Sequence, residues 1–368
     1  MKIDVVIGTR PEAIKMAPVI LELRRRELFR VRVIATGQHT DMLSQALGYF
    51  SLSADADLGI MKSRQSLDHI TSAVLSGVGE LFDEAPPDAV LVHGDTTTTF
   101  ASALAAFYRH IPIGHVEAGL RSADMGRPFP EEMNRVFADR MATWWFAPTA
   151  LARENLRREG ARDDGICVTG NTVVDALKTA LARRAGGDAP EALAKGLSGR
   201  RFVLLTAHRR ESWGAPLERI CRALLGILEG YPDLMALVPM HKNPTVRDVM
   251  KERLEGCRRV ILCDPLDYPD FVWAMDNCEL IMSDSGGVQE EATSLRKPAL
   301  ILRDVTERPE AIEQGSCVLV GTDEGRITGE ASAILSGGEA LARLMERSLK
   351  NPFGDGSASA KIADALSR

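Results

Sequence analysis

Short apolar runs rich in β-branched residues alternate with longer helical stretches along most of this 368-residue chain. In the first half the predicted strands are 2–8, 29–36, 88–93, 111–117 and 144–149. Helical patterns over 11–26 and 97–108 lie between them. Strands that alternate with helices in this way predict a parallel sheet with helices packed against its faces.

The alternation breaks once, over 183–200, where the glycine-containing stretches AGGDAP and GLSGR occur. It then restarts with predicted strands at 202–206, 236–240, 260–262, 280–282, 299–302 and 317–320. A chain of this length is expected to form two domains, and we place the crossing between them within 170–200.

The predicted fold is therefore α/β, with two Rossmann-like, doubly wound domains. We assign 1–170 to the first domain and 171–351 to the second, with a C-terminal helix at about 352–368 crossing back onto the first. Tandem sheets of this kind bind ligands at the carboxyl ends of their strands, so we expect a cleft between the domains.

Charge and hydropathy limit the binding partners that this chain is expected to have. The formal net charge of -6 argues against nucleic acid, because a phosphate backbone calls for a basic surface. No apolar run has the length of a membrane span, and the N-terminus MKIDVVIGTRPE lacks a signal-peptide pattern. We therefore expect a cytoplasmic protein that does not contact membranes.

The stretch SDSGGVQEEA, residues 283–292, follows an apolar run and opens a helical pattern. Strand, Ser-Gly-Gly and helix together form a phosphate-binding arrangement. Gly286 and Gly287 let a ligand approach the main chain, Ser285 offers a hydroxyl, and the helix start presents N–H groups with partial positive charge. A phosphorylated ligand is expected here, and Glu291 can accept hydrogen bonds from sugar hydroxyls.

The first strand ends in GTRPEAIKMAP, which places Arg10 and Lys15 at the ligand edge of the first sheet. Ordinary surface charge is the simplest explanation for either residue, but their position favours contact with an anion. The chain contains no G-x-G-x-x-G sequence, which weakens the case for a bound dinucleotide.

Three further turns of the first domain carry carboxylates. Asp95 follows a strand in VHGDTTTT, where capping of the next helix is the alternative role. Glu117 follows a strand in HVEAGLRS, and Glu131 and Glu132 open a helix in PFPEEMNR, where the helix dipole accounts for one of them. Asp95, Glu117 and one of the glutamate pair suit proton transfer next to Arg10 and Lys15.

A metal site is the weaker interpretation of these acids. No His–carboxylate spacing typical of zinc sites lies nearby, the cysteines form no C-x-x-C, and the two cations would repel a metal.

In the second domain, His208 in TAHRRES and His241 in PMHKNP follow strands, where a histidine can contact a diphosphate or serve only the structure. Phe271 can lie against a base, although core packing explains it better. Arg308 in TERPE, together with Ser285 and the glycines, suits a diphosphate clamp.

Eight motifs together resemble the non-hydrolysing UDP-N-acetylglucosamine 2-epimerases of bacteria. They are GTRPEAIKMAP, VHGDTTTT, GHVEAGLRS, PFPEEMNR, TGNTVVDAL, TAHRRES, SDSGGVQEEA and TERPEAIE, in this order from residue 3 to about residue 321. The resemblance implies a fold like that of GT-B glycosyltransferases and a homodimer. It also implies interconversion of UDP-GlcNAc and UDP-ManNAc through elimination of UDP to 2-acetamidoglucal and re-addition, with no cofactor.

The resemblance also implies roles for individual residues. The positions that match proton-transfer and neighbouring active-site groups are Asp95, Glu117, Glu131, Lys15 and His208. The positions that match the binding site for UDP and the sugar are Arg10, Phe271, Ser285, Gly286, Gly287, Glu291 and Arg308. The positions that match a second site, where UDP-GlcNAc activates some members, are Gln38, Arg64, Arg209 and His241. Some activated members carry glutamine where this chain has Asp41, which departs from that pattern.

Three other functions remain open from the residues. A glycosyltransferase of the same architecture would need a separate acceptor, for which the chain shows no obvious binding segment. A non-catalytic nucleotide-sugar sensor would not need the three carboxylates. A 2-epimerase of a modified UDP-sugar would differ only in the groups around the sugar.

Overall fold

The structure is a computed structural model that describes residues 1–37, 40–62, 65–183, 190–197 and 199–368. It contains two compact units. The first unit comprises Met1–Ala176 together with Phe353–Arg368, and the second comprises Leu177–Pro352. The C-terminal segment therefore belongs to the first unit.

The first unit is built on a parallel sheet. Within the described residues its strands are β1 (Lys2–Ile7), β2 (Arg30–Ala35), β3 (Ala56–Asp57), β4 (Ala89–His93), β5 (Ile113–Val116), β6 (Trp144–Ala147) and β7 (Ile166–Val168). They lie in the order β3-β2-β1-β4-β5-β6-β7. Every residue of β4 and β5 is buried, as expected for central strands covered by helices on both faces.

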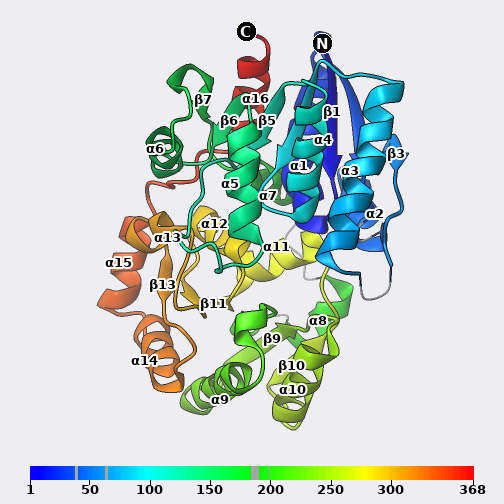
Figure 1. The fold of residues 1–368 in the computed structure, drawn as a ribbon. Helices are drawn as coiled ribbons and strands as arrows, with labels where there is room; N and C mark the ends of the chain where they lie inside the picture. Colours follow the sequence, from blue (N-terminus) through cyan, green and yellow to red (C-terminus); the bar gives the residue numbers. More distant parts are fainter. Residues whose placement is uncertain (38–39, 63–64, 184–189, 198) are drawn as a thin grey trace. The chain divides into compact units, whose positions relative to one another are not determined.

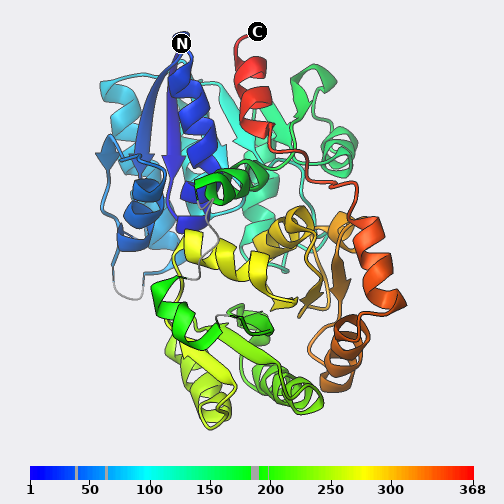
Figure 2. The same ribbon diagram turned by 180° about the vertical axis from the view of Figure 1, so that it is seen from behind.

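Helices cover both faces of this sheet. They are α1 (Arg10–Arg25), α2 (Thr40–Tyr49), α3 (Leu67–Glu84), α4 (Thr97–Tyr108), α5 (Glu131–Met141), α6 (Ala150–Arg158), α7 (Thr172–Arg183) and α16 (Ala358–Leu366), with a short 3-10 turn, η1 (Asp163–Gly165). Helices α3, α4 and α5 pack side by side on one face, and α1 and α16 pack together on the other (Figures 1 and 2).

The second unit repeats the plan. The strands that the structure describes there are β8 (Phe202–Thr206), β9 (Met235–Pro239), β10 (Val260–Cys263), β11 (Leu280–Ser283), β12 (Ala299–Ile301) and β13 (Cys317–Leu319). All run parallel in the order β10-β9-β8-β11-β12-β13. The prediction of an α/β fold with two parallel sheets is confirmed.

The helices of the second unit are α8 (Glu191–Leu197), α9 (Ala215–Gly230), α10 (Pro244–Leu254), α11 (Tyr268–Asn277), α12 (Gly286–Leu295), α13 (Pro309–Glu313), α14 (Glu324–Leu335) and α15 (Glu339–Arg347), with a 3-10 turn, η2 (Arg210–Ser212). Helix α9 lies between α10 and α14 (Figure 1). Among the helices that the structure describes, none has the length and apolar character needed to cross a membrane.

Local sequence explains why the elements begin where they do. Helix α1 starts with a capping box, in which the Thr9 side chain accepts from the backbone of Glu12 and the Glu12 side chain accepts from the backbone of Thr9. Proline at the start and arginines in the last turn also favour this helix. The sequence interpretation did not identify α2, α3 or β3 individually. Strand β3 is only two residues long, which is too short to show an apolar run.

Candidate active site

Both sheets reverse their strand order at one point. In the first unit the reversal lies between β1 and β4, and in the second it lies between β8 and β11. Doubly wound sheets bind ligands beyond the carboxyl ends of strands at such a switch point. Arg10, Asp95, His208 and Ser285 lie just after these strands, so the topology places these four predicted residues at the edges where sheets of this type bind ligands.

Glu117 is the most constrained of the predicted carboxylates. It follows β5 with a φ of 68°, a backbone region that costs a non-glycine residue of order 1 kcal/mol. Its side chain is buried, forms an ion pair with buried Lys15, and accepts a 2.7 Å hydrogen bond from Asn171 Nδ2. The structure therefore brings together two predicted residues, Lys15 and Glu117, and adds Asn171, the residue before α7.

His93, the last residue of β4, completes this group. Its Nε2 lies 3.7 Å from Glu117 Oε2 and has no hydrogen-bond partner among the described residues. Burial lowers the pKa of His93 to about 4, even though the carboxylate of Glu117 favours the protonated ring. A neutral imidazole thus lies against the Lys15–Glu117 ion pair at neutral pH, and the sequence interpretation did not single it out.

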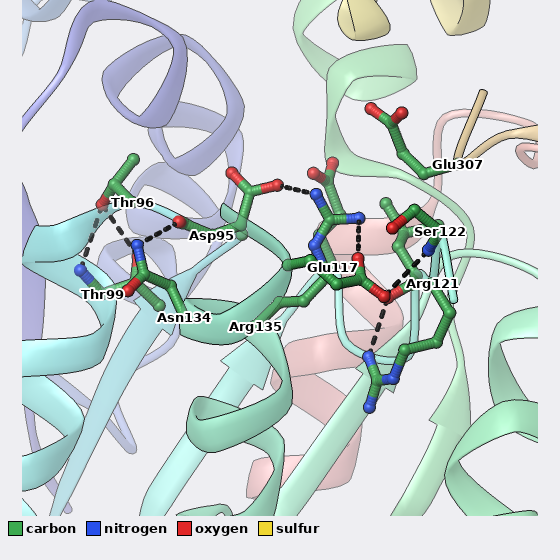
Figure 3. Close-up of polar contacts among 12 residues, drawn as sticks. Asp95, Thr96, Thr99, Glu117, Arg121, Ser122, Asn134, Arg135 and Glu307 are labelled. Atoms are coloured by element: carbon green, nitrogen blue, oxygen red, sulfur yellow. Dashed lines mark hydrogen bonds and ion pairs between the residues drawn. The ribbon is translucent and has the colours of Figure 1, made fainter. Parts of the chain in front are cut away.

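Asp95 lies in the turn between β4 and α4, but it does not cap that helix. The cap is Thr96, whose hydroxyl accepts from Thr99 N at 3.0 Å. The Asp95 carboxylate instead pairs with Arg135. The backbone carbonyl of Asp95 accepts a 2.9 Å hydrogen bond from Asn134 Nδ2 (Figure 3). Both partners come from α5, so this helix fixes the turn that presents Asp95.

The two glutamates that open α5 have different surroundings. Glu131 is half-buried at the first position of the helix. Glu132 is buried and accepts hydrogen bonds from the backbone of Ser122 at 2.9 Å and Ala123 at 3.2 Å. Glu132 therefore holds the loop before α5, whereas Glu131 remains the member of the pair that we predicted as a site residue.

Arg10 is half-buried as the first residue of α1. Close to it, Glu12 is buried and accepts from the backbone N–H groups of Gly8 at 3.0 Å and Thr9 at 2.7 Å. Its other oxygen accepts a 2.8 Å bond from the hydroxyl of Thr96. Glu12 thus links the turns after β1 and β4, which flank the switch point of the first sheet.

In the second unit a buried aspartate fixes the turn that carries His208. Asp284 is fully buried and accepts from His208 N at 2.9 Å, Arg209 N at 2.9 Å and Ser212 Oγ at 2.9 Å. It follows β11 directly, while His208 follows β8, the neighbouring strand. The imidazole of His208 stacks on that of His241, with ring centroids 5.7 Å apart.

The predicted phosphate turn begins α12. Ser285 is its N-cap and makes no capping bond with its side chain. A Cβ on Gly286 would lie 2.6 Å from Arg308 Nη1, whereas a Cβ on Gly287 would meet no atom within 4 Å. Gly286 is therefore required by packing inside the unit, while the absence of a side chain at Gly287 leaves space beside the helix start.

Arg308 is buried in an ion cluster. Its Nε donates to Glu290 at 2.7 Å, and its Nη1 donates to Glu307. Glu307 also accepts from Arg303 Nη1 at 2.8 Å, and Arg209 Nη2 lies 3.8 Å from it. The positive charge of Arg308 is thus matched by two buried carboxylates, which sequence reasoning about a diphosphate clamp did not identify.

The remaining predicted residues lie on separate elements. Phe271 is half-buried on α11, Glu291 is buried on α12, and His241 is exposed after β9. Gln38 and Arg64, predicted for the second UDP-GlcNAc site, lie outside the described residues. Among the residues that are described, no group of three or more His, Cys, Asp or Glu is arranged to hold a metal ion.

The fold and these groups define a two-unit Rossmann-type α/β protein with acids at one switch point and a phosphate-type turn at the other. A family model described as UDP-N-acetylglucosamine 2-epimerase matches residues 21–367. The UDP-N-acetylglucosamine 2-epimerase of Escherichia coli K12 is 46% identical over 371 residues, covering 100% of this chain and 98% of the relative.

Solved structures agree with this match. The UDP-GlcNAc 2-epimerase of Neisseria meningitidis bound to UDP-GlcNAc has a TM-score of 0.94 and 42% identity, with 100% of this chain and 99% of that chain covered. The enzyme of Methanocaldococcus jannaschii, in complex with UDP-GlcNAc and UDP, has a TM-score of 0.86 and 34% identity, with the same coverage. This chain belongs to the UDP-N-acetylglucosamine 2-epimerase family.

Proposed function

We propose that the protein catalyses reversible inversion at C2 of UDP-N-acetylglucosamine, which gives UDP-N-acetylmannosamine. The observation that carries this proposal is the buried Glu117, held in a strained backbone conformation between Lys15, Asn171 and His93 at the ligand edge of the first sheet. Strain and buried charge of this kind concentrate at functional sites. Family membership supports the same conclusion and is consistent with the sugar nucleotides bound to related enzymes.

The proposed reaction proceeds in two steps, elimination of UDP and its re-addition. A carboxylate removes the proton from C2 while the C1–O bond breaks, the C–H electron pair forms the C1=C2 double bond, and UDP leaves with the bonding pair. A proton is then delivered to the opposite face of C2 as a UDP oxygen re-forms the bond to C1. The sugar is neither oxidised nor reduced overall, so the step needs no redox partner.

The groups of the first unit suit the proton transfers. Asp95, Glu117 and Glu131 are proposed as the carboxylates, and Lys15 is proposed to keep Glu117 ionised when the free enzyme binds substrate. The C2 proton is weakly acidic, so its removal must be assisted by departure of UDP. A set of ionised carboxylates beside fixed cations supplies both a base and an acid once one carboxylate has been protonated.

The groups of the second unit suit a nucleoside diphosphate. We assign the diphosphate to His208 and to the start of α12, where the Ser285 side chain makes no capping bond and the position of Gly287 leaves open space beside the helix N-terminus. Because Arg308 is already paired with two carboxylates, its proposed contribution is to fix the turn as well as to attract phosphate. Phe271 and Glu291 are assigned to the uridine, and Arg10 to the leaving group.

Deuterium exchange tests the activity directly. Incubation with UDP-GlcNAc in D₂O should place deuterium at C2 and yield UDP-ManNAc, and a folded protein that exchanges neither sugar nucleotide would reject the proposal. D95N and E117Q should abolish exchange while UDP binding, measured by calorimetry, is retained. E154Q is the matched control, because the Glu154 side chain on α6 is 43% exposed and this variant should exchange at the wild-type rate.

Activation by a second UDP-GlcNAc, and a homodimer, are further parts of the proposal. Arg209 and the exposed His241 lie next to His208 on the second unit. If they help to bind an activator, turnover of pure UDP-ManNAc should accelerate when a trace of UDP-GlcNAc is added. Unchanged rates would remove the activator from the proposal, and sedimentation analysis would test the dimer.

A further inference from the structure

The most enclosed titratable side chain of the first unit is His115, which the proposed reaction does not use. It lies on β5 and is 0% exposed. Its Nε2 is 2.8 Å from the carbonyl oxygen of Gly94, and its Nδ1 is 2.6 Å from Asp139 Oδ1 on α5. Both ring nitrogens therefore face oxygen atoms at hydrogen-bond distance.

These contacts define the protonation state of the ring. A carbonyl oxygen can only accept, so Nε2 of His115 must carry a hydrogen. The carboxylate of Asp139 also acts as an acceptor, since its other oxygen accepts from Gly119 N at 3.1 Å and pairs with Arg121 Nη2 at 2.8 Å. Nδ1 must then carry a hydrogen as well.

Charge balance leads to the same state. Arg121 also pairs with Glu159 through two hydrogen bonds of 2.7 Å. The cluster thus holds two carboxylates, the buried Asp139 and the 30% exposed Glu159, against one guanidinium. Because Arg121 is shared between the two acids, a cationic His115 gives the buried Asp139 a positive partner of its own and makes the cluster neutral.

The cluster links the two turns that carry proposed catalytic acids. Gly94 immediately precedes Asp95, and Gly119 follows Glu117 by two residues. His115 donates to the first turn, and Asp139 accepts from the second. The other ionisable groups that face this region are His93, whose pKa the charge of His115 helps to lower, and the Lys15–Glu117 pair.

We propose that His115 is a doubly protonated positioning residue that, through Gly94 and Asp139, holds the Asp95 and Glu117 turns in place for the epimerisation. The role in epimerisation rests on the proposed function, whereas the two-proton state does not. Small displacements of a reacting group cost large factors in rate, so this fixation bears directly on turnover.

The protonation state can be read from the ¹⁵N spectrum of the histidine-labelled protein. The signals of His115 are assigned by their absence in H115Q, or in H115N should H115Q not fold. At neutral pH both ring nitrogens should give the ¹⁵N shifts of protonated nitrogen, because each faces an acceptor oxygen. A spectrum with a single protonated nitrogen at neutral pH would overturn the inference, whatever the activity.

D139N provides an internal check on the geometry. The asparagine oxygen must face Gly119 N and Arg121, which are donors, so its amide nitrogen faces Nδ1 of His115. The ring should then change to the neutral form with hydrogen on Nε2 only, keeping the bond to Gly94. A ring that stays doubly protonated in D139N would show that Asp139 does not control it.

The positioning role is tested by rates of C2 exchange. H115Q should lower kcat by about 100-fold while KM and UDP affinity stay within about twofold of wild type. H110N is the control, because His110 is exposed and its φ of 55° suits asparagine. Wild-type kcat in folded H115Q would refute the role. Absence of exchange in the wild type would instead refute the proposed function, leaving the spectrum to decide the protonation state.

Discussion

Removal of the Asp284 carboxylate should loosen the turn that carries His208. The D284A substitution deletes the acceptor for His208 N, Arg209 N and Ser212 Oγ, each 2.9 Å from Oδ2. A hydrogen bond to a charged group contributes about 1.5–3 kcal/mol. The His208 side chain is 39% exposed, so water can partly replace the lost acceptor. We therefore expect the free energy of unfolding to fall by about 3 kcal/mol, which is less than the sum of three such hydrogen bonds.

D284N distinguishes hydrogen bonding from charge. All three short contacts converge on Oδ2, while Oδ1 has longer contacts with His208, 3.1 Å to the backbone N and 3.4 Å to Nδ1. The asparagine oxygen can take the place of Oδ2 and keep the three bonds, so the expected loss is only about 1 kcal/mol. The matched surface control is D276A on α11, where the aspartate is exposed.

Urea unfolding followed by circular dichroism measures these losses, and calorimetry gives the melting temperatures. For a unit of this size we expect Tm to fall by about 6–12 °C in D284A and by about 2–4 °C in D284N. UDP affinity should weaken in the same order, because His208 is proposed to contact the diphosphate. Equal destabilisation by the two variants, or a loss below about 1 kcal/mol in D284A, would refute the hydrogen-bond argument.

Three other substitutions test separate parts of the structure. G287A should stabilise the free protein by about 0.5–1 kcal/mol, since α12 gains a helix-favouring residue in open space, yet it should weaken UDP binding in calorimetry if the diphosphate lies there. The pKa of His93 is about 4 in the folded protein and about 6.5 in the unfolded chain, so its contribution is present above pH 6.5 and lost as pH falls toward 4. Wild type should therefore lose about 2 kcal/mol more than H93N between pH 7 and pH 5 in urea unfolding, and parallel losses would contradict this assignment. R308M should destabilise by about 3–5 kcal/mol because it removes a buried positive charge that pairs with Glu290 and Glu307, and adding E290Q should recover part of that loss; no recovery would show that charge is not the cause.

Local patterns were sufficient to predict the sheets and the strand, Ser-Gly-Gly turn and helix around Ser285, whereas phosphate binding at this turn stays a prediction. Strands such as β4 and β11 are continuous apolar runs bounded by turn residues, and Ser285-Gly-Gly is followed by a helical period. The signal is contained within a few neighbouring residues, so no tertiary information is needed to interpret it. The same is true of Glu117, which follows a strand and is poorly explained by capping.

The partners of the site residues could not be predicted in the same way. Asn134, Arg135 and Asp139 lie on one polar helix, and the sequence shows only that Arg135 and Asp139 have the i, i+4 spacing of a common face. Which turn each of them meets depends on the order β4-β5-β6 and on how α5 packs. Asp284 lies inside the stretch SDSGGVQEEA, but its contacts with the turn after β8 exist only because β8 and β11 are neighbours in the sheet.

One physical device recurs in the described parts of both units. A buried carboxylate accepts from the backbone N–H groups of a turn at the ligand edge: Glu12 from Gly8 and Thr9, Asp139 from Gly119, and Asp284 from His208 and Arg209. A carboxylate can only accept and is bound here to the main chain, so it fixes the turn without occupying the side chains that the turn presents. Acids that hold a turn and acids that transfer protons should therefore separate by experiment. Loss of the first kind lowers stability together with activity, whereas loss of the second kind, as in D95N at the half-buried Asp95, lowers turnover far more than stability.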